Sequence, residues 1–343
     1  MTGRLAIAAP QLIDLHPAAA DLRRLVVAGM ERQPRQLPAW LLYDDEGSRL
    51  FDAICQQPEY GLTRTETALL EQRAPELAQA LGPGVLVEFG AGSARKVSPL
   101  LEALQPAAYV ALDISTGHLL QACRALQQRH PTTPVLGIGC DYSQLERLPA
   151  HPWLEQRRLG FYPGSSIGNF SPDEAVTLLR QFRKLLGPDS RLLIGIDQPK
   201  AVERLEAAYN DQAGYSAAFA LNLLSRLNRD LEGDFRLETF RYHAWWQAES
   251  SRIAMALISC EPQTVTLAGR RWAFAAGEPL ITECSVKYTP SAFAQLAQRA
   301  GWRPLQRWSD AQGDLSLHLL EPADEWGPAT DLQPDSIQQH SDR

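Results

Sequence analysis

The sequence predicts an α/β protein built on a parallel sheet, and three features support this fold class. First, short apolar segments typical of buried strands recur along the chain, at residues 85–89, 109–115, 134–142, 158–164 and 191–197. Second, segments with helical spacing of apolar residues alternate with these strands, as expected for parallel strands joined by right-handed crossovers. Third, glycines or acids follow the first three strands, at the edge where open α/β sheets bind ligands.

The first strand leads into the most informative stretch of the chain. Residues 85–89 are apolar apart from Glu88, with β-branched valines and no helical spacing, which predicts a buried strand. Gly90 and Gly92 follow. Because glycine has no Cβ, the backbone there can turn tightly and approach a ligand closely. From about Ala94 the apolar residues recur at i, i+3, i+4 and i+7, which predicts a helix.

The glycine pattern alone allows more than one interpretation. Arg95 stands where the dinucleotide fingerprint has its third glycine, which argues against a bound pyrophosphate and against a nicotinamide-dependent oxidoreductase. Glu88 directly before the glycines instead resembles motif I of S-adenosylmethionine methyltransferases. A tight turn in some other α/β protein remains the alternative at this point.

Acids end the second and third strands. Asp113 lies 23 residues after Gly90 (113 minus 90), close to the offset of about 20 residues at which an acid binds ribose hydroxyls. Asp141 can accept a hydrogen bond from an adenine amino group, and Tyr142 can pack on the ring. Each acid alone could equally be a helix cap, but three such strand ends at one sheet edge indicate a binding site.

A polar, glycine-rich loop, residues 164–170, follows the fourth strand. Asn169 in this loop offers both a donor and an acceptor, which suits a group that holds a nucleophile. The alternative is that Asn169 is simply a turn residue.

Further elements precede and follow the sheet segments. Helices are predicted at residues 18–30, from Gly47-Ser48, and from Thr65 as an N-cap. Residues 200–229 predict one helix that contains Tyr209 and Asn210. Strands are then predicted at residues 235–240, 242–247, 253–259, 264–268 and 271–275. A helix at residues 291–300 and strands around Leu305 and at 315–320 close the chain.

Composition excludes several function classes. The 343 residues carry a net charge of −7 and no basic stripe, so nucleic acid is not expected as a partner. The five cysteines are scattered and form no C-x-x-C pair, so neither a metal site nor a disulfide framework is expected. No apolar run approaches the roughly 20 residues that span a bilayer. We expect a cytoplasmic protein without membrane contact, and a monomer.

Six motifs occur in an order that resembles one family. They are Tyr43-Asp44-x-x-Gly47-Ser48-x-Leu50-Phe51, Pro58-Glu59-Tyr60-x-x-Thr63-Arg64-x-Glu66, the Gly90/Gly92 loop, Gly164-Ser165-Ser166-Ile167-Gly168-Asn169, Tyr209-x-Asp211-x-x-Gly214 and Thr282-Glu283-x-Ser285-x-Lys287-Tyr288. Together they resemble the histidine-specific Nα-methyltransferases of ergothioneine biosynthesis, over about residues 38–320.

The resemblance implies an α/β fold with a Rossmann-like class I methyltransferase sheet and an inserted substrate-binding lobe. It implies S-adenosylmethionine as cofactor, L-histidine as substrate, and three transfers that give the trimethyl betaine hercynine. The residues implied for the cofactor are Gly90, Gly92, Lys96, Asp113, Asp141 and Tyr142. Those implied for histidine are Tyr60, Asn169, Tyr209, Glu283 and Ser285, with Asn169 and Tyr43 as catalytic residues. No metal is implied.

The expected domain division follows from this. The sheet domain takes residues 65–198 and 287–322, the substrate-binding lobe takes residues 1–64 and 199–286, and residues 323–343 form a polar tail. Three positions depart from the family pattern: Phe89, Gly61 and Asn210. The alternatives are an N-methyltransferase for another amino acid or small aromatic amine, and a non-catalytic ligand-binding relative.

Overall fold

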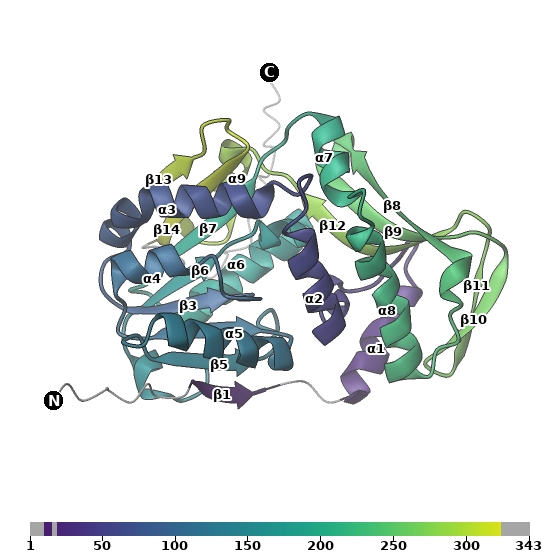
Figure 1. Cartoon of the computed structure of the whole chain (residues 1–343), viewed down its shortest axis with the longest axis horizontal. Coiled ribbons are helices and arrows are strands. Elements are labelled where there is room, and N and C mark those ends of the chain that lie inside the picture. The colour runs from purple at the N-terminus through teal and green to yellow at the C-terminus, as the bar shows by residue number, and fades with distance from the viewer. Residues whose placement is uncertain (1–9, 16–18, 324–343) are drawn as a thin grey trace, which may run out of the picture.

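A computed structural model describes residues 10–15 and 19–323 of the chain. Its centre is an eight-stranded sheet with the strand order β1-β5-β4-β3-β6-β7-β14-β13 (Figure 1). The strands are β1 Gln11–Asp14, β3 Val85–Phe89, β4 Tyr109–Asp113, β5 Val135–Gly139, β6 Arg158–Tyr162, β7 Arg191–Asp197, β13 Trp302–Ser309 and β14 Leu315–Pro322. The first six in the sheet order are parallel, and β14 and β13 form an antiparallel edge. This confirms the five predicted strands and the closing hairpin.

Helices cover both faces of this sheet, because its strands carry apolar side chains on both sides. On β3, Val85, Val87 and Phe89 belong to one core with helices α6 and α9, and Leu86 belongs to the other core with α3, α4 and α5. The helices are α3 Leu62–Leu81, α4 Ser98–Leu104, α5 Thr116–Arg129, α6 Pro172–Leu186 and α9 Pro290–Arg299. Burial on both faces explains the continuous apolar runs of the strands.

Several predicted helix starts were wrong by a few residues. Helix α2 (Asp45–Ile54) begins before Gly47-Ser48, because the Asp44 side chain caps it by accepting the Gly47 N–H at 2.8 Å. Helix α3 begins at Leu62, so Thr65 lies within its first turn. Helix α4 begins at Ser98, after Ala94 has taken a left-handed backbone conformation with φ 50°.

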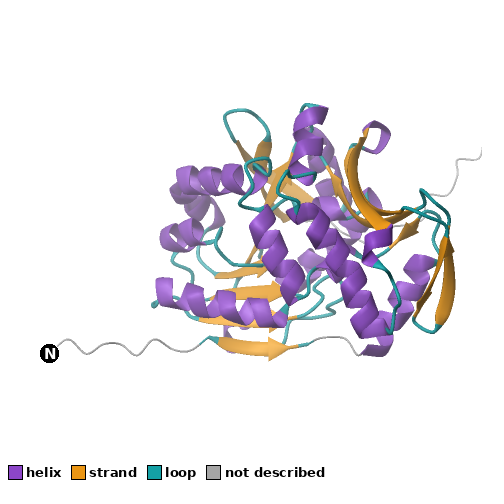
Figure 2. Ribbon diagram, turned by 45° about the vertical axis from the view of Figure 1, so that its right-hand side comes forward, coloured by secondary structure: helices purple, strands orange, loops and turns teal. Residues whose placement is uncertain are grey.

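The remaining elements form a second lobe, which we define as residues 19–54 and 202–286. Its four-stranded sheet has the order β2-β12-β9-β8, next to a two-stranded hairpin of β10 and β11. The strands are β2 Arg35–Gln36, β8 Phe240–Gln247, β9 Arg252–Ser259, β10 Gln263–Leu267, β11 Arg270–Phe274 and β12 Pro279–Val286, and the helices are α1 Ala19–Met30, α2, α7 Val202–Tyr209 and α8 Tyr215–Leu231. Figures 1 and 2 show this lobe beside the large sheet, with the β10–β11 hairpin at its outer edge.

The second lobe departs from the sequence prediction in two places. Residues 200–229 form two helices, because the Asp211 side chain accepts the Tyr215 and Ser216 N–H groups and starts α8 anew after Gly214. The strand predicted at 235–240 is instead a short 3₁₀ turn at Leu237–Thr239.

The described termini add one finding. Strand β1 pairs with β5 in the large sheet, so the N-terminal segment contributes to both parts of the molecule. Of the predicted polar tail, only Ala323 lies within the described residues. Among the helices of the described residues, none is long and apolar enough to cross a membrane.

Candidate active site

A cavity lies between the loop that follows β6 and the second lobe. The empty space in it, about 610 Å³, includes the open solvent at its mouth. All six side chains predicted to contact or act on histidine line it, together with further aromatic, apolar and hydroxyl groups. The lining includes Tyr43, Phe51, Tyr60, Ser165, Asn169, Tyr209, Phe219, Tyr242, Met255, Glu283 and Ser285.

Strand β12 supplies the most polar wall of this cavity. Its register against β9 shifts between Ile281 and Glu283. From there Glu283, Ser285 and Lys287 follow at two-residue spacing, and alternate residues of a strand point to the same face. All three side chains are buried. The spacing therefore brings a carboxyl, a hydroxyl and an ammonium group to one side of the strand.

Glu283 is held by two residues from distant parts of the chain. Asn169 donates from Nδ2 to Glu283 Oε1 at 2.8 Å, and the Tyr43 hydroxyl donates to the same oxygen at 3.4 Å. Burial raises the pKa of Glu283 to about 8, against the opposing effects of Tyr43 and Lys287. Within the described residues no protein donor reaches Oε2, which leaves this oxygen for a ligand.

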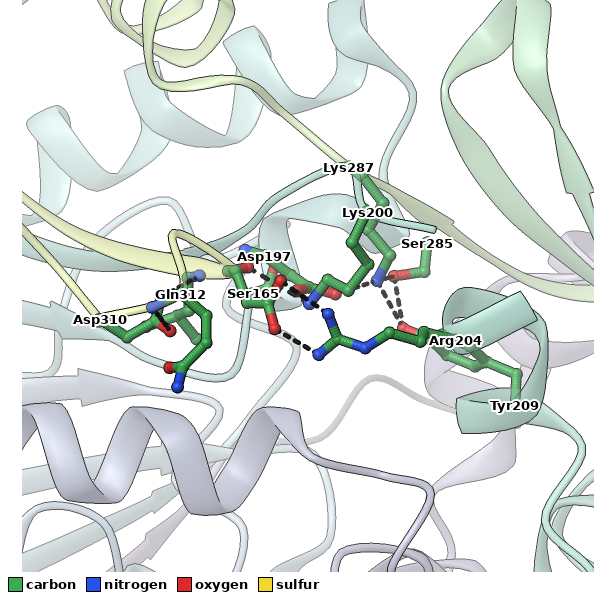
Figure 3. A network of polar contacts seen from close by, with 11 residues as sticks. Ser165, Asp197, Lys200, Arg204, Tyr209, Ser285, Lys287, Asp310 and Gln312 are labelled. Carbon is green, nitrogen blue, oxygen red and sulfur yellow. Dashed lines mark hydrogen bonds and ion pairs between the residues drawn. The ribbon is translucent and has the colours of Figure 1, made fainter. Parts of the chain in front are cut away.

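A second polar cluster surrounds Lys287, which is fully buried (Figure 3). Its Nζ lies 2.6 Å from Asp197 Oδ2 and donates to Tyr209 Oη at 2.7 Å and to Ser285 Oγ at 2.9 Å. The Tyr209 hydroxyl in turn donates to Ser285 Oγ at 2.9 Å. Burial is the largest single effect and lowers the pKa of Lys287, but the charges of and hydrogen bonds to Asp197 and Tyr209 together outweigh burial and raise it above its usual value.

Asp197 joins this cluster to the end of the sheet. Its Oδ1 accepts from Lys200 Nζ at 2.7 Å, and its backbone N–H donates to Ser165 Oγ at 2.9 Å (Figure 3). Burial raises the pKa of Asp197, but Lys287 and Lys200 outweigh burial and lower it. Neither Asp197 nor Lys287 was predicted as a site residue. Polar residues recur at every second position at 283, 285 and 287, and this alternation could have indicated Lys287 as a site residue.

The cofactor residues predicted from the sequence gather at the sheet edge, which we define as the ends of β3, β4 and β5 and the residues that follow. Gly90 and Gly92 adopt left-handed conformations with φ 70° and 53°. Asp113 accepts the Gly92 N–H on Oδ2 at 2.8 Å and the Ser115 N–H on Oδ1 at 2.9 Å. The Ile114 N–H also hydrogen-bonds this carboxylate. A carboxylate has about four lone-pair sites, so acceptor capacity remains for a ribose hydroxyl.

Asp141 and Tyr142 lie in the loop after β5, at the same edge. Asp141 Oδ1 accepts from the backbone and side chain of Ser143, at 3.0 and 2.6 Å. The Tyr142 hydroxyl shares a hydrogen bond with Tyr162 at 3.3 Å. A Cβ at Gly90 would lie 3.4 Å from this hydroxyl, so Tyr142 lies against the glycine turn.

Lys96 is paired in a way that the sequence did not predict. Its Nζ donates to Glu66 Oε2 at 2.8 Å, and Glu66 also accepts the Gly164 N–H at 2.8 Å. Burial lowers the pKa of Lys96, but the charge of Glu66 and the hydrogen bond to it are the main effects that raise it, and the pKa lies above its usual value. An ammonium group has three donors, so Lys96 keeps two for a carboxylate. Gly164 also lines the cavity, so the sheet edge and the cavity meet there.

These groups fit the cofactor that the resemblance implies. The glycine turn leaves space for a ligand, since nothing lies within 4 Å of a Cβ built at Gly92. Asp113 retains acceptors for hydroxyls, Lys96 retains donors for a carboxylate, and the cavity next to them retains an acceptor on Glu283. The arrangement can therefore hold two ligands that meet near Gly164.

Comparisons with known proteins identify relatives of this chain. The family model described as "Histidine-specific methyltransferase, SAM-dependent" matches residues 22–322. The histidine N-alpha-methyltransferase of Mycolicibacterium smegmatis is 38% identical over 88% of this chain and 95% of its own length. That of Mycobacterium tuberculosis is 34% identical over 87% and 94%. Among solved structures, the CcbJ methyltransferase of Streptomyces caelestis matches 76% of this chain and 89% of its own, at 16% identity and a TM-score of 0.43.

Proposed function

The chain belongs to the family of S-adenosylmethionine-dependent, histidine-specific methyltransferases, and we propose that it methylates the α-amino group of L-histidine. Three successive transfers would give the trimethyl betaine hercynine for ergothioneine biosynthesis. The observation that carries this proposal is the buried carboxyl of Glu283 in the cavity wall. Its Oε1 is fixed by Asn169 and Tyr43, and its Oε2 is left for an N–H group of the substrate.

Glu283 and Ser285 suit an imidazole ring, since neutral imidazole carries one N–H donor and one acceptor nitrogen. A carboxylate oxygen can take the donor, and a hydroxyl proton can go to the acceptor. An aromatic amino acid without ring nitrogens would leave both buried groups unpaired, and this is how such a site rejects an analogue. The aromatic side chains of the lining, such as Tyr43 and Phe219, would pack on the ring.

We propose that Gly90, Gly92, Lys96, Asp113, Asp141 and Tyr142 hold S-adenosylmethionine at the sheet edge. When bound, this cofactor supplies a methyl group on a sulfonium, which is already an activated donor. The tasks left for the chain are to bind the amine, orient it and keep it from water. Orientation of this kind can contribute roughly 7–11 kcal/mol to lowering a barrier in favourable cases.

Asn169 is placed for the amine. Its Nδ2 is used by Glu283, so Oδ1 is the atom that can accept an N–H of the α-amino group and direct the nitrogen lone pair. The amine must lose a proton before it attacks. Tyr60 offers a further hydroxyl to the amino or carboxylate group, and Tyr209, whose own proton goes to Ser285, can still accept a hydrogen bond from the amine. The catalytic role predicted for Tyr43 stays a prediction, and its contact with Glu283 supports a role in fixing that carboxyl.

We further propose that residues 19–64 and 199–286 act as the substrate-binding lobe, and that residues 65–198 and 287–322 act as the methyltransferase domain together with strand β1, which pairs with β5. The cavity lining supports this division, because Tyr43, Tyr209 and Glu283 come from the lobe and Asn169 from the sheet domain. We also propose a monomer in the cytoplasm. One chain supplies the whole lining, and the five cysteines are all free thiols, as in a reducing compartment.

The test is a mass spectrum of the purified protein incubated with S-adenosylmethionine and a mixture of all common amino acids. We expect methylated histidine alone, with the trimethyl form as the final product. Methylation of a different amino acid, or of none, would overturn the substrate assignment. The control variant Glu249→Ala, in an exposed turn of the second lobe, is expected to behave as the wild type.

A further inference from the structure

Lys287 differs from the other polar residues of the site, because all of its hydrogen-bonding capacity is used inside the protein. An ammonium group has three donors and no acceptor. Lys287 Nζ is within 2.6 to 2.9 Å of Asp197 Oδ2, Tyr209 Oη and Ser285 Oγ, one partner for each proton. The side chain is fully buried. Lys287 therefore cannot itself bind a ligand in the cavity, and its contribution must pass through the two hydroxyls.

The directions of the hydroxyl protons follow from this. Tyr209 Oη accepts from Lys287 and donates to Ser285 Oγ at 2.9 Å. Ser285 Oγ thus accepts from both Lys287 and Tyr209, which uses its two lone pairs. The Ser285 proton is the remaining group, and the described residues offer no acceptor for it. Because Ser285 lines the cavity, this proton is available to a ligand there.

The charge at this end of the cavity is also fixed. Asp197 lies between two ammonium groups, with Oδ1 on Lys200 and Oδ2 on Lys287. One carboxylate and two ammonium groups leave a net positive charge beside Ser285 and Tyr209. Two residues before Ser285 on β12, Glu283 presents its Oε2 oxygen to the cavity. The cavity is therefore polarised, with a donor at Ser285 and an acceptor at Glu283.

We propose that Lys287, anchored by Asp197, is a positioning residue that fixes Ser285 as a hydrogen-bond donor, so that the cavity selects substrates with an acceptor atom at this end. The acceptor is a ring nitrogen lone pair or an oxygen of the α-carboxylate. This inference rests on the proposed function, since it concerns the amino-acid substrate of the same cavity. It adds a residue outside the cavity lining to the groups that decide specificity.

A double-mutant cycle on Lys287 and Ser285 tests the proposal, with the affinity for L-histidine measured by calorimetry. Lys287→Met is expected to lose about 10- to 100-fold in affinity, the usual range for a hydrogen bond to a charged group. Ser285→Ala is expected to lose about as much. When Lys287→Met is added to Ser285→Ala, histidine affinity should fall by less than about a further threefold. The hydroxyl through which Lys287 acts is already absent in that background.

The matched control is Lys200→Met. Lys200 donates to the same carboxylate of Asp197 but contacts neither Tyr209 nor Ser285. If Lys287 served only to neutralise Asp197, the two lysine variants would weaken histidine binding equally, and the proposal would be wrong. Losses that add in the double variant, or an equal loss of S-adenosylmethionine affinity in Lys287→Met, would also overturn it.

Two further measurements identify the substrate atom that accepts from Ser285 and test this inference separately from the proposed function. L-Histidinol lacks the carboxylate, so a Lys287→Met penalty that disappears with histidinol assigns the acceptor to the carboxylate, and one that persists assigns it to the ring. Either result supports the proposal. If the wild type methylates a different amino acid, the cycle is run with that one, and the two proposals then succeed or fail separately. A wild type that methylates no amino acid overturns both.

Discussion

At the sheet edge, the acids Asp113 and Asp141 accept from backbone N–H groups, whereas in the cavity Glu283 is held by side chains from distant parts of the chain. Asp113 accepts the N–H groups of Gly92 and Ser115, which lie 21 and 2 residues away. Glu283 is held by Asn169 and Tyr43, which lie 114 and 240 residues away.

This difference has a physical origin. A cofactor that is common to many substrates can be bound by one βαβ unit, where glycines and strand ends already place the backbone. A substrate pocket needs several side chains around one small molecule, so it draws on elements of both parts of the molecule. A substitution at the sheet edge should therefore affect ligand binding through the conformation of the backbone turn. A substitution in the cavity should affect it through the loss of one hydrogen-bond partner.

The largest effect is expected from Glu283→Ala. If this variant lost affinity for both histidine and S-adenosylmethionine, the distinction between the cavity and the sheet edge would be wrong. The variant removes the oxygen that would accept from the histidine ring and the oxygen that accepts from Asn169 Nδ2. Histidine affinity should therefore fall by about 100-fold or more. Calorimetry with S-adenosylmethionine should give the wild-type affinity. Unchanged histidine affinity would refute the imidazole assignment, and Glu249→Ala serves as the surface control.

A smaller effect is expected from Asp113→Ala at the sheet edge. S-Adenosylmethionine affinity should fall by about 10- to 50-fold, because the variant loses the ribose acceptor and releases the Gly92 and Ser115 N–H groups. Asp113→Asn keeps one acceptor oxygen and should lose less. Histidine binding without cofactor should stay near the wild-type value. Undiminished cofactor affinity in Asp113→Ala would contradict the assignment of this edge.

The smallest effect concerns stability, and it compares two buried acids. Burial raises the pKa of both Glu283 and Glu88 from 4.5 to about 8. The folded protein then binds more protons than the unfolded chain between these values. The stability that each protonated carboxyl contributes is thus fully present below pH 4.5 and lost as the pH rises through about 8.

Glu283→Gln and Glu88→Gln should therefore each gain stability relative to the wild type as the pH rises across this window, by at least about 1 kcal/mol. Chemical denaturation at several pH values measures this gain. Saturating histidine should flatten the pH dependence due to Glu283 and leave that due to Glu88, because only Glu283 faces the cavity. Equal responses of both acids to histidine would remove the distinction between cavity and core.

Sequence reasoning predicted the sheet well because its signals are local. The five strands predicted for the parallel part of the sheet lie within three residues of the observed bounds, since apolar runs and the glycine turn are continuous in the chain. Helix starts were less accurate, because Gly47-Ser48 and Thr65 are suitable cap residues, and only the folded chain shows that Asp44 supplies the cap of α2. The break before α8 was missed for the same reason.

The cavity was predicted residue by residue only through the family resemblance. All six of its predicted side chains lie together, although no pattern in the sequence joins Tyr43 to Glu283. The supporting residues Glu66, Asp197 and Lys287 were missed as site residues. Glu66 accepts from Gly164, which lies 98 residues further along the chain, and Lys287 contacts Asp197 and Tyr209. These pairings are visible only in the folded protein.

The ion pair of Asp197 and Lys287 also has a mechanical consequence. The chain leaves the large sheet after Asp197, and Lys287 directly follows β12, the last strand of the second lobe. The Tyr288 N–H donates to the Asp197 carbonyl at 3.2 Å beside the ion pair. The exit from the large sheet and the end of the second lobe are thus held together at one point, by an ion pair and by a backbone hydrogen bond. Tyr209 and Ser285 contact Lys287 at this point, so the same ion pair that joins the two parts of the molecule also fixes one wall of the cavity.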